Sequence, residues 1–166
     1  SGSPPTHFRE KGWGMSKEAL KQRVCEEIDR HAGRIMEIGE SIWQNPELGF
    51  KEFQTSKVVQ DVFDFLELQY ESGLAITGVK SMVEGGKSGP TVAVMGELDS
   101  VLVADHPSAD QETGAAHCCG HNAQIATMIG TAMGLLGANA LPELAGRVSF
   151  MAVPAEEYVE IDYRNE

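Results

Sequence analysis

His117-Cys118-Cys119-Gly120-His121-Asn122 (residues 117–122) is the most informative stretch of the sequence, and it stands directly before a helix-like run. Apolar residues recur at helical spacing through that run, which predicts a helix over residues 121–136 with Gly137 as its stop. A Cys and a His separated by one Gly, just before a helix, can both point at one metal ion. The apolar residues of this helix are Ile125, Met128, Ile129, Met133 and Leu136.

A second chemically informative stretch lies one supersecondary unit later. Residues 147–153 are mostly apolar and predict a buried strand, and Pro154-Ala155-Glu156-Glu157 follow it. Ligand sites in open α/β sheets usually lie outside the carboxyl ends of strands. The two glutamates are therefore expected at such an edge, where successive side chains point in different directions.

Together the two stretches look like part of a hydrolytic metal centre. Thiolate and imidazole are common zinc ligands, and a catalytic zinc site adds a carboxylate and keeps one position open for water. Cys119, His121 and Glu157 supply these ligand types, and Glu156 beside them is a candidate general base. Each part alone has an ordinary explanation, because many cysteines are small core residues and most carboxylates are solvated.

The rest of the chain predicts alternating helices and strands. We expect one long amphipathic helix from the N-cap Ser16 to about Trp43, ended by Asn45-Pro46, and a second helix over residues 52–68 whose buried side includes Phe65. Strands are expected at 75–83 and 91–95, separated by the turn at 85–90, and a long functional loop at 99–116. This order predicts a layered α/β domain, helix-sheet-helix, with helices on both sheet faces.

Four stretches in order are similar to a known family. The chain resembles the N-terminal part of the dinuclear zinc amidohydrolases and exopeptidases, which include hippurate hydrolase, the indole-acetyl-amino-acid hydrolases and carboxypeptidase G. Within that group it is most similar to the aminobenzoyl-glutamate hydrolase-like branch. The stretches are Asn45-Pro46-Glu47-Leu48-Gly49-Phe50, Gly96-Glu97-Leu98-Asp99, residues 117–124 and residues 153–157.

The resemblance implies a role for each site residue. Cys119, His121 and Glu157 would be metal ligands, Glu156 the catalytic base, and Asp99 a catalytic-site residue that orients a ligand. The complete enzyme would carry two divalent metal ions, Zn or Mn, and cleave the amide of an N-acyl amino acid or an aminobenzoyl-glutamate-like substrate. Glu97 stands where other branches have a His ligand, and the resemblance implies that the Cys119 thiolate replaces it. His117 matches a position near the metals, or is a hydrogen-bonded loop histidine.

Two departures from the family pattern stand out. This chain has Asn122-Ala123-Gln124 where relatives often have Asp and, two residues later, His. All five histidines also precede Glu156, whereas the family supplies further metal-binding histidines from later segments. We therefore expect residues 15–166 to be the N-terminal part of a truncated, zinc-exopeptidase-like catalytic domain. The alternative to an enzyme is that this chain alone is a non-catalytic fragment or a weak metal-binding module. It would then bind one metal ion or none.

Composition restricts the partners. The formal net charge is −12, which disfavours nucleic acid and anionic membranes. No apolar run approaches a membrane span and no signal peptide is evident, so a cytoplasmic location is expected. Residues 1–14 are interpreted as a flexible tail or expression scar, and unfilled sheet edges lead us to expect a homodimer.

A thiol enzyme is the remaining alternative from the sequence. It would use Cys118 or Cys119 with His117 or His121. Nucleophile and base usually meet through the fold rather than through adjacent positions, which disfavours this reading. The three cysteines are too few and too awkwardly spaced for a disulfide framework and are expected to be reduced.

Overall fold

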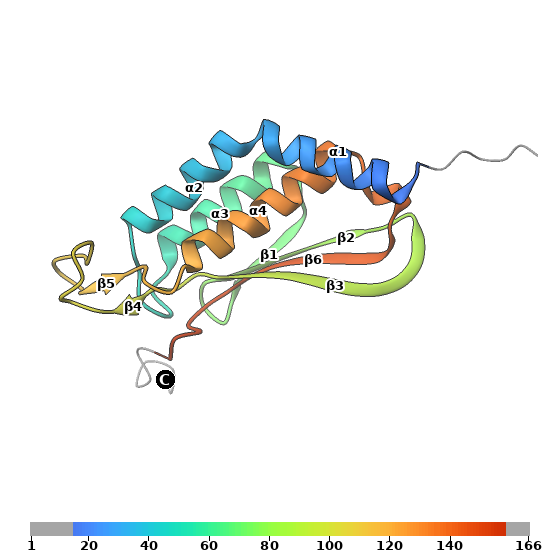
Figure 1. Cartoon of the computed structure of the whole chain (residues 1–166). Coiled ribbons are helices and arrows are strands. Elements are labelled where there is room, and N and C mark those ends of the chain that lie inside the picture. Colours follow the sequence, from blue (N-terminus) through green and yellow to red (C-terminus); the bar gives the residue numbers. More distant parts are fainter. Residues whose placement is uncertain (1–14, 159–166) are drawn as a thin grey trace, which may run out of the picture.

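The structure is a computed structural model that describes residues 15–158. Figure 1 shows four helices lying along a twisted sheet. The helices are α1 (Lys17–Arg30), α2 (Ala32–Gln44), α3 (Phe53–Phe65) and α4 (His121–Gly137), with a short 3-10 helix at Leu141–Glu143. The strands are β1 (Tyr70–Leu74), β2 (Gly78–Glu84), β3 (Lys87–Glu97), β4 (Val101–Leu102), β5 (Ala115–Ala116) and β6 (Ala145–Val153).

The main sheet is mixed, with strand order β1-β2-β6-β3. β1 and β2 are antiparallel, β2 and β6 are antiparallel, and β6 lies parallel to β3. β3, α4 and β6 therefore form a crossover unit in which a helix connects two adjacent parallel strands. Because β3 and β6 are parallel, their carboxyl ends meet at one edge of the sheet, where Glu97 pairs in register with Val153.

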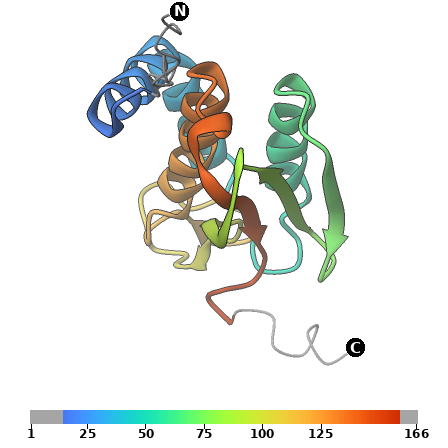
Figure 2. The same ribbon diagram turned by 90° about the vertical axis from the view of Figure 1, so that its right-hand side faces the viewer.

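Helices cover one face of the sheet in the described part of the chain. Figures 1 and 2 show α1 to α4 on the same side of β1, β2, β6 and β3. The α/β class and the layered arrangement are confirmed, but the expected helix layer on the second face is not formed by residues 15–158. β3 accordingly has a mostly exposed burial pattern.

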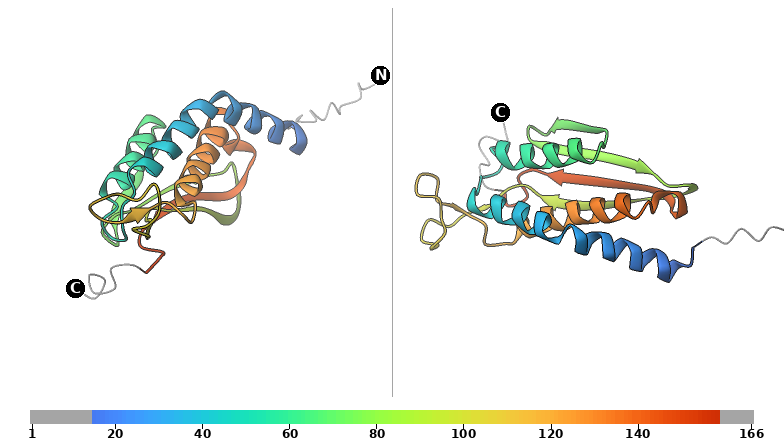
Figure 3. Two further views of the ribbon diagram at one scale, coloured as in Figure 1. Left: turned by 60° about the vertical axis from the view of Figure 1, so that its left-hand side comes forward. Right: turned by 90° about the horizontal axis from the view of Figure 1, so that it is seen from above.

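The predicted first helix is two helices. α1 and α2 are separated at His31, whose backbone N–H still bonds to the carbonyl oxygens of Glu27 and Ile28. Both helices lie against α4 (Figure 3). Val24 and Ile28 of α1 and Ile35 of α2 all contact α4, so the apolar spacing continues through the break and does not reveal it. Ser16 caps α1 as predicted, since its hydroxyl accepts a hydrogen bond from the Ala19 N–H.

The strands in the structure differ from the predicted ones more than the helices do. The segment expected as one strand at 75–83 belongs to a hairpin, because residues 75–77 form the turn between β1 and β2. Ala75 and Ile76 adopt positive φ there, which β-strand residues do not. β3 begins at Lys87 within the predicted turn, and the 99–116 loop contains the small antiparallel pair β4–β5.

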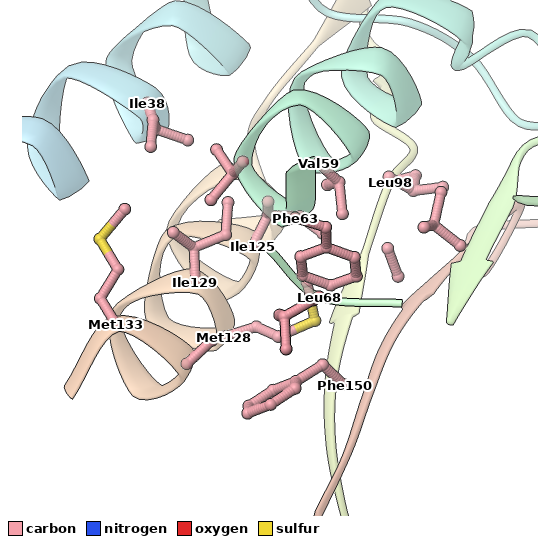
Figure 4. Close-up of a cluster of buried hydrophobic side chains, with 14 of the residues drawn as sticks. Ile38, Val59, Phe63, Leu68, Leu98, Ile125, Met128, Ile129, Met133 and Phe150 are labelled. Carbon is pink, nitrogen blue, oxygen red and sulfur yellow. The ribbon is translucent and has the colours of Figure 1, made fainter. Parts of the chain in front are cut away.

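The hydrophobic core lies between α4, α3 and the inner face of the sheet. Figure 4 shows Phe63 of α3 and Phe150 of β6 in one cluster with the α4 side chains Ile125, Met128 and Ile129. The predicted α4 residues Ile125, Met128, Ile129 and Met133 are all buried. Phe65, predicted as core, is 72% exposed, because it lies on the outer side of α3 near its end. None of the helices within residues 15–158 is long and apolar enough to cross a membrane.

α4 approaches β3 closely at one glycine. A Cβ built at Gly96 would lie 2.9 Å from Ile125 Cδ1 and 3.1 Å from the Ile125 backbone nitrogen. A contact with helix backbone cannot be relieved by a side-chain rotation. Gly96 thus sets the separation between β3 and α4. On β3 this contact lies one residue before Glu97, and on α4 it lies at Ile125, one turn after His121.

We predict that Gly96→Ala lowers the free energy of unfolding by about 1–3 kcal/mol, because α4 must move away from β3. Denaturant unfolding followed by circular dichroism measures this. Gly33→Ala is the control, since a Cβ there meets nothing within 4 Å and the change should stabilise α2 by up to ~1 kcal/mol. Equal effects from the two substitutions would contradict the close-contact interpretation.

Candidate metal centre

The predicted site residues converge at the carboxyl edge of the β3–β6 pair. Glu97 ends β3, Glu156 and Glu157 follow β6, and His121 begins α4. Gly120 precedes His121 with φ of +90°, a left-handed conformation that glycine adopts without strain. The chain can therefore turn sharply from the 117–119 loop into α4 and present the His121 side chain to the strand ends.

The His121 imidazole is the centre of the cluster. Its Nε2 lies 2.8 Å from Glu97 Oε2, 3.6 Å from Glu157 Oε1 and 3.8 Å from Glu156 Oε2. On the other side of the ring, Nδ1 lies 2.8 Å from the Asp99 carbonyl oxygen. Since His121 is buried, these contacts replace solvent around the ring.

The contact with Asp99 fixes the tautomer of His121. A carbonyl oxygen only accepts, so Nδ1 must carry the proton and donate it to Asp99. In the neutral ring Nε2 then has a lone pair directed at the Glu97 carboxylate, which also only accepts. A proton on the ring or on the carboxyl group, or a cation bound by both atoms, makes this arrangement favourable.

The charge of the cluster favours a cation. Four carboxylates, from Glu97, Asp99, Glu156 and Glu157, have an oxygen within 4 Å of this one imidazole. Even a protonated His121 would leave several negative charges uncompensated by the ring. Donor atoms of Glu97, His121 and Glu156 all lie within 4.8 Å of one another. This N/O donor set fits a divalent ion such as zinc or manganese.

Asp99 connects His121, at the start of α4, with the segment that follows β6. It is fully buried, and its Oδ2 accepts a hydrogen bond of 2.9 Å from the Glu157 backbone N–H. Its Oδ1 lies 3.4 Å from His121 Nδ1 and has no hydrogen-bond partner among the described residues. Asp99 thus contacts both a candidate ligand on α4 and the segment after β6, which suits the orienting role implied by the resemblance.

Cys119 lies beside the cluster, next to Glu157. Its side chain is exposed, and a hydrogen bond to the Glu157 carboxylate, together with partial burial and the neighbouring negative charges, raises the pKa of the thiol to about 11. Without a cation nearby, the thiol is therefore protonated at neutral pH. A cation would have to displace this proton to gain the thiolate as a ligand, and a thiol nucleophile would be poorly activated here.

His117 is buried beside the cluster and has an unusual environment. Both of its ring nitrogens are buried and lack hydrogen-bond partners within residues 15–158. Burial, and then the proximity of His121, lower the pKa of His117 to about 4, so the ring is neutral at pH 7. The structure therefore does not support the reading of His117 as a hydrogen-bonded loop histidine.

The contribution of Glu97 to this site is not expected from the sequence, whereas for the Asn45–Phe50 motif a turn near the substrate cleft and a plain helix-ending loop are both open readings. Glu97 was interpreted as a lost ligand position, yet its carboxylate makes the shortest contact with His121 Nε2. The Asn45–Phe50 motif is more than the end of a helix, because the Glu47 carbonyl oxygen accepts hydrogen bonds from both the N–H and the hydroxyl of Ser100. The sequence does contain a signal for Glu97, because a carboxylate at the carboxyl end of a predicted strand is expected at the edge of the sheet where the site lies.

Comparison with known proteins places this geometry in a family. The chain is 32% identical over 142 residues to thermostable carboxypeptidase 2 of Saccharolobus solfataricus, covering 83% of this chain and 36% of that protein. It is 31% identical over 135 residues to N-acetylcysteine deacetylase of Bacillus subtilis, covering 75% of this chain and 33% of the relative. No protein-family model matches the chain.

A solved structure agrees in fold. The Bacillus subtilis YXEP protein, described as a dinuclear metal binding peptidase from the M20 family, superposes with a TM-score of 0.67 at 30% identity. The alignment covers 78% of this chain and 37% of that structure. This chain belongs to the M20 family of amidohydrolases and peptidases. It spans about a third of the length of its M20 relatives.

Membership in the M20 family agrees with the metal-centre interpretation of the cluster. The YXEP protein is described as binding two metals, and this chain collects a compatible donor set at the sheet edge. The metal and catalytic roles of Cys119, His121, Glu156, Glu157 and Asp99 stay predictions. Cys119 reaches the cluster through Glu157, whereas Glu97 contacts His121 directly.

We predict that Cys119 reacts slowly with iodoacetamide in chelator-treated protein, because at pH 8 only about one thiol in a thousand is ionised when the pKa is near 11. The rate should rise about tenfold per pH unit up to that pKa. Mass spectrometry of a chain carrying Cys25→Ser and Cys118→Ser reports Cys119 alone.

Glu157→Gln should accelerate this alkylation, because it removes the acceptor and charge that hold the thiol protonated. Glu143→Gln, in the distant 3-10 helix, is the matched control and should leave the rate unchanged. A rate in the folded chain equal to that of the urea-denatured chain at pH 8 would show that the cluster does not perturb Cys119.

Proposed function

We propose that this chain contributes a metal-binding part of the active site of an amidohydrolase or peptidase. The observation that carries the proposal is the convergence of Glu97, His121 and Glu156 within 4.8 Å at the carboxyl edge of the sheet, which puts the Glu156 carboxylate close enough to act on a water held beside Glu97 and His121. Glu157 and the Cys119 thiol lie at the side of this cluster as further candidate ligands. The names of the M20 relatives, a carboxypeptidase and a deacetylase, support hydrolysis of an amide bond.

The residues of the chain have distinct roles in this proposal. Glu97, His121, Glu157 and Cys119 would hold divalent metal, which supplies Lewis acidity toward a water and an amide carbonyl. Glu156, whose side chain is 51% exposed, is free to reach the substrate side. Its carboxylate would accept a proton from the attacking water and return it to the leaving amine nitrogen.

Asp99 would keep this arrangement in place without touching the substrate. Its carbonyl oxygen holds the Nδ1 proton of His121, so Nε2 stays available as a ligand atom. Its carboxylate accepts a hydrogen bond from the Glu157 amide, which keeps the segment after β6 beside His121. Asp99 is thus placed to orient His121 and the Glu156-Glu157 segment together.

The substrate proposed is an N-acyl amino acid or an aminobenzoyl-glutamate-like amide. The name of N-acetylcysteine deacetylase, which acts on an N-acylated amino acid, favours the first of these. Two divalent ions, Zn or Mn, would serve the complete enzyme. The proposal has three further parts. The protein would act on a small molecule rather than on nucleic acid or a membrane, it would be cytoplasmic, and it would form a homodimer.

One alternative has its own observation. This chain spans about a third of its relatives, and its five histidines all precede Glu156. A chain with one histidine in the cluster could bind a metal ion without catalysing hydrolysis. Mixing it with the C-terminal two thirds of an M20 relative separates the readings, because restored amidase activity requires a split active site.

We predict that the chain binds zinc and that His121→Ala abolishes this binding. Glu97→Gln and Cys119→Ala should each weaken zinc affinity by at least ~10-fold, because each removes a candidate ligand. Titration calorimetry and elemental analysis of dialysed protein measure affinity and metal content. Glu143→Gln is the control for a lost surface carboxylate, and absence of zinc from the wild-type chain would refute a metal site in this chain.

Glu156→Gln should abolish amide hydrolysis while sparing metal content, because an amide cannot take a proton from water. The assay uses a polypeptide of the relatives' length that contains this sequence, with N-acetyl amino acids as substrates. A fall in turnover of at least ~100-fold is expected for loss of a general base. Retained turnover in the variant would exclude Glu156 as the base.

A further inference from the structure

Glu52 is a buried carboxylate that lies outside the metal cluster and hydrogen-bonds to Ala155, the residue before Glu156. It stands at the start of α3 and has no exposed surface. Its Oε2 accepts a hydrogen bond of 2.6 Å from the Thr77 hydroxyl, and its Oε1 accepts one of 2.8 Å from the Ala155 backbone N–H. Burying a carboxylate costs several kcal/mol of free energy unless it is hydrogen-bonded, so the bonds from Thr77 and Ala155 are needed to keep Glu52 in this position.

Ala155 needs such a partner because its backbone is strained. Its φ is +53°, in the left-handed region that costs a non-glycine residue about 1–2 kcal/mol. Ala155 is also buried, and it directly precedes Glu156 and Glu157. The turn at Ala155 therefore decides in which direction both glutamates leave β6.

The segment after β6 is anchored on either side of Glu156. Glu52 holds the amide of Ala155, and Asp99 holds the amide of Glu157. Both anchoring carboxylates are fully buried, whereas Glu156 between them is half exposed. An exposed acid between two buried anchors is the arrangement expected where one side chain must reach a substrate from a fixed backbone.

We infer that Glu52 is a positioning residue, which holds the left-handed turn at Ala155 and so directs Glu156 and Glu157 toward His121. This deepens the proposed function, on which its metal-binding consequence rests. Glu52 does not itself contact the cluster. It acts through a backbone amide 103 positions further along the chain.

The test compares four variants of the chain. Glu52→Leu removes both acceptors, and Glu52→Gln keeps the shape and an acceptor for Ala155. Ser56→Ala is the matched structural control, because the Ser56 hydroxyl donates a buried hydrogen bond to the Thr77 carbonyl oxygen from the same helix without contacting residue 155. Glu52→Asp, too short to reach both partners, replaces Glu52→Leu if that variant does not fold.

The first readout is amide hydrogen exchange by NMR. The measured quantity is the ratio of the exchange rate of the Glu157 amide to that of the Phe150 amide in the core. The Glu157 amide bonds to Asp99 and not to Glu52. In Glu52→Leu this ratio should rise at least ~10-fold. Glu52→Gln and Ser56→Ala should leave that ratio within ~2-fold of wild type. Equal ratios in Glu52→Leu and Ser56→Ala would overturn the inference, because Glu52 would then be merely part of the core.

The second readout is Co²⁺ affinity by titration. Glu52→Leu should weaken it by about 10–100-fold, as loss of a residue that orients ligands typically does, while Ser56→Ala leaves it unchanged. Co²⁺ affinity unchanged in Glu52→Leu would also overturn the inference. If the wild-type chain binds no Co²⁺ while Glu157 exchange still responds to Glu52→Leu, positioning by Glu52 stands and the proposed metal site in this chain fails.

Discussion

The hydrogen bond between His121 Nδ1 and the Asp99 carbonyl oxygen is the interaction on which the site depends. It sets the tautomer of the ring, and it ties the start of α4 to the loop after β3. Nε2 is thereby turned toward Glu97 and the two glutamates after β6. Because His121 and Asp99 are both buried, water cannot easily replace either partner, and the cluster keeps its geometry.

Much of the fold follows from local patterns that are visible in the sequence. The spacing of Ile125, Met128, Ile129 and Met133 predicts α4, and the apolar run at 147–153 predicts β6, because both elements bury their apolar residues in the same core. The break at His31 is not visible, since the apolar stripe continues through it. β1 is also missed, because Tyr70–Leu74 has a mostly exposed pattern and is stabilised by pairing with β2.

The site could be predicted in its residue types but not in its contacts. Cys119, His121, Glu156 and Glu157 are suggested by ligand chemistry, yet Glu52 gives no local signal, since a glutamate near a helix start usually faces solvent. Its importance comes from Thr77 and Ala155, and only the folded chain brings them together. Glu97 is a similar case, because its role depends on the parallel register of β3 with β6.

The crossover from β3 through α4 to β6 also has a kinetic consequence. Parallel strands cannot be joined by a tight turn, so this pairing forms only after a long loop has closed, and such non-local contacts form slowly. Glu97 and Glu156 come from the two strand ends that this slow step joins, so the cluster is absent from any earlier state of the chain. An ion that binds it would then bind the native chain alone, and its concentration would set how long the folded form persists.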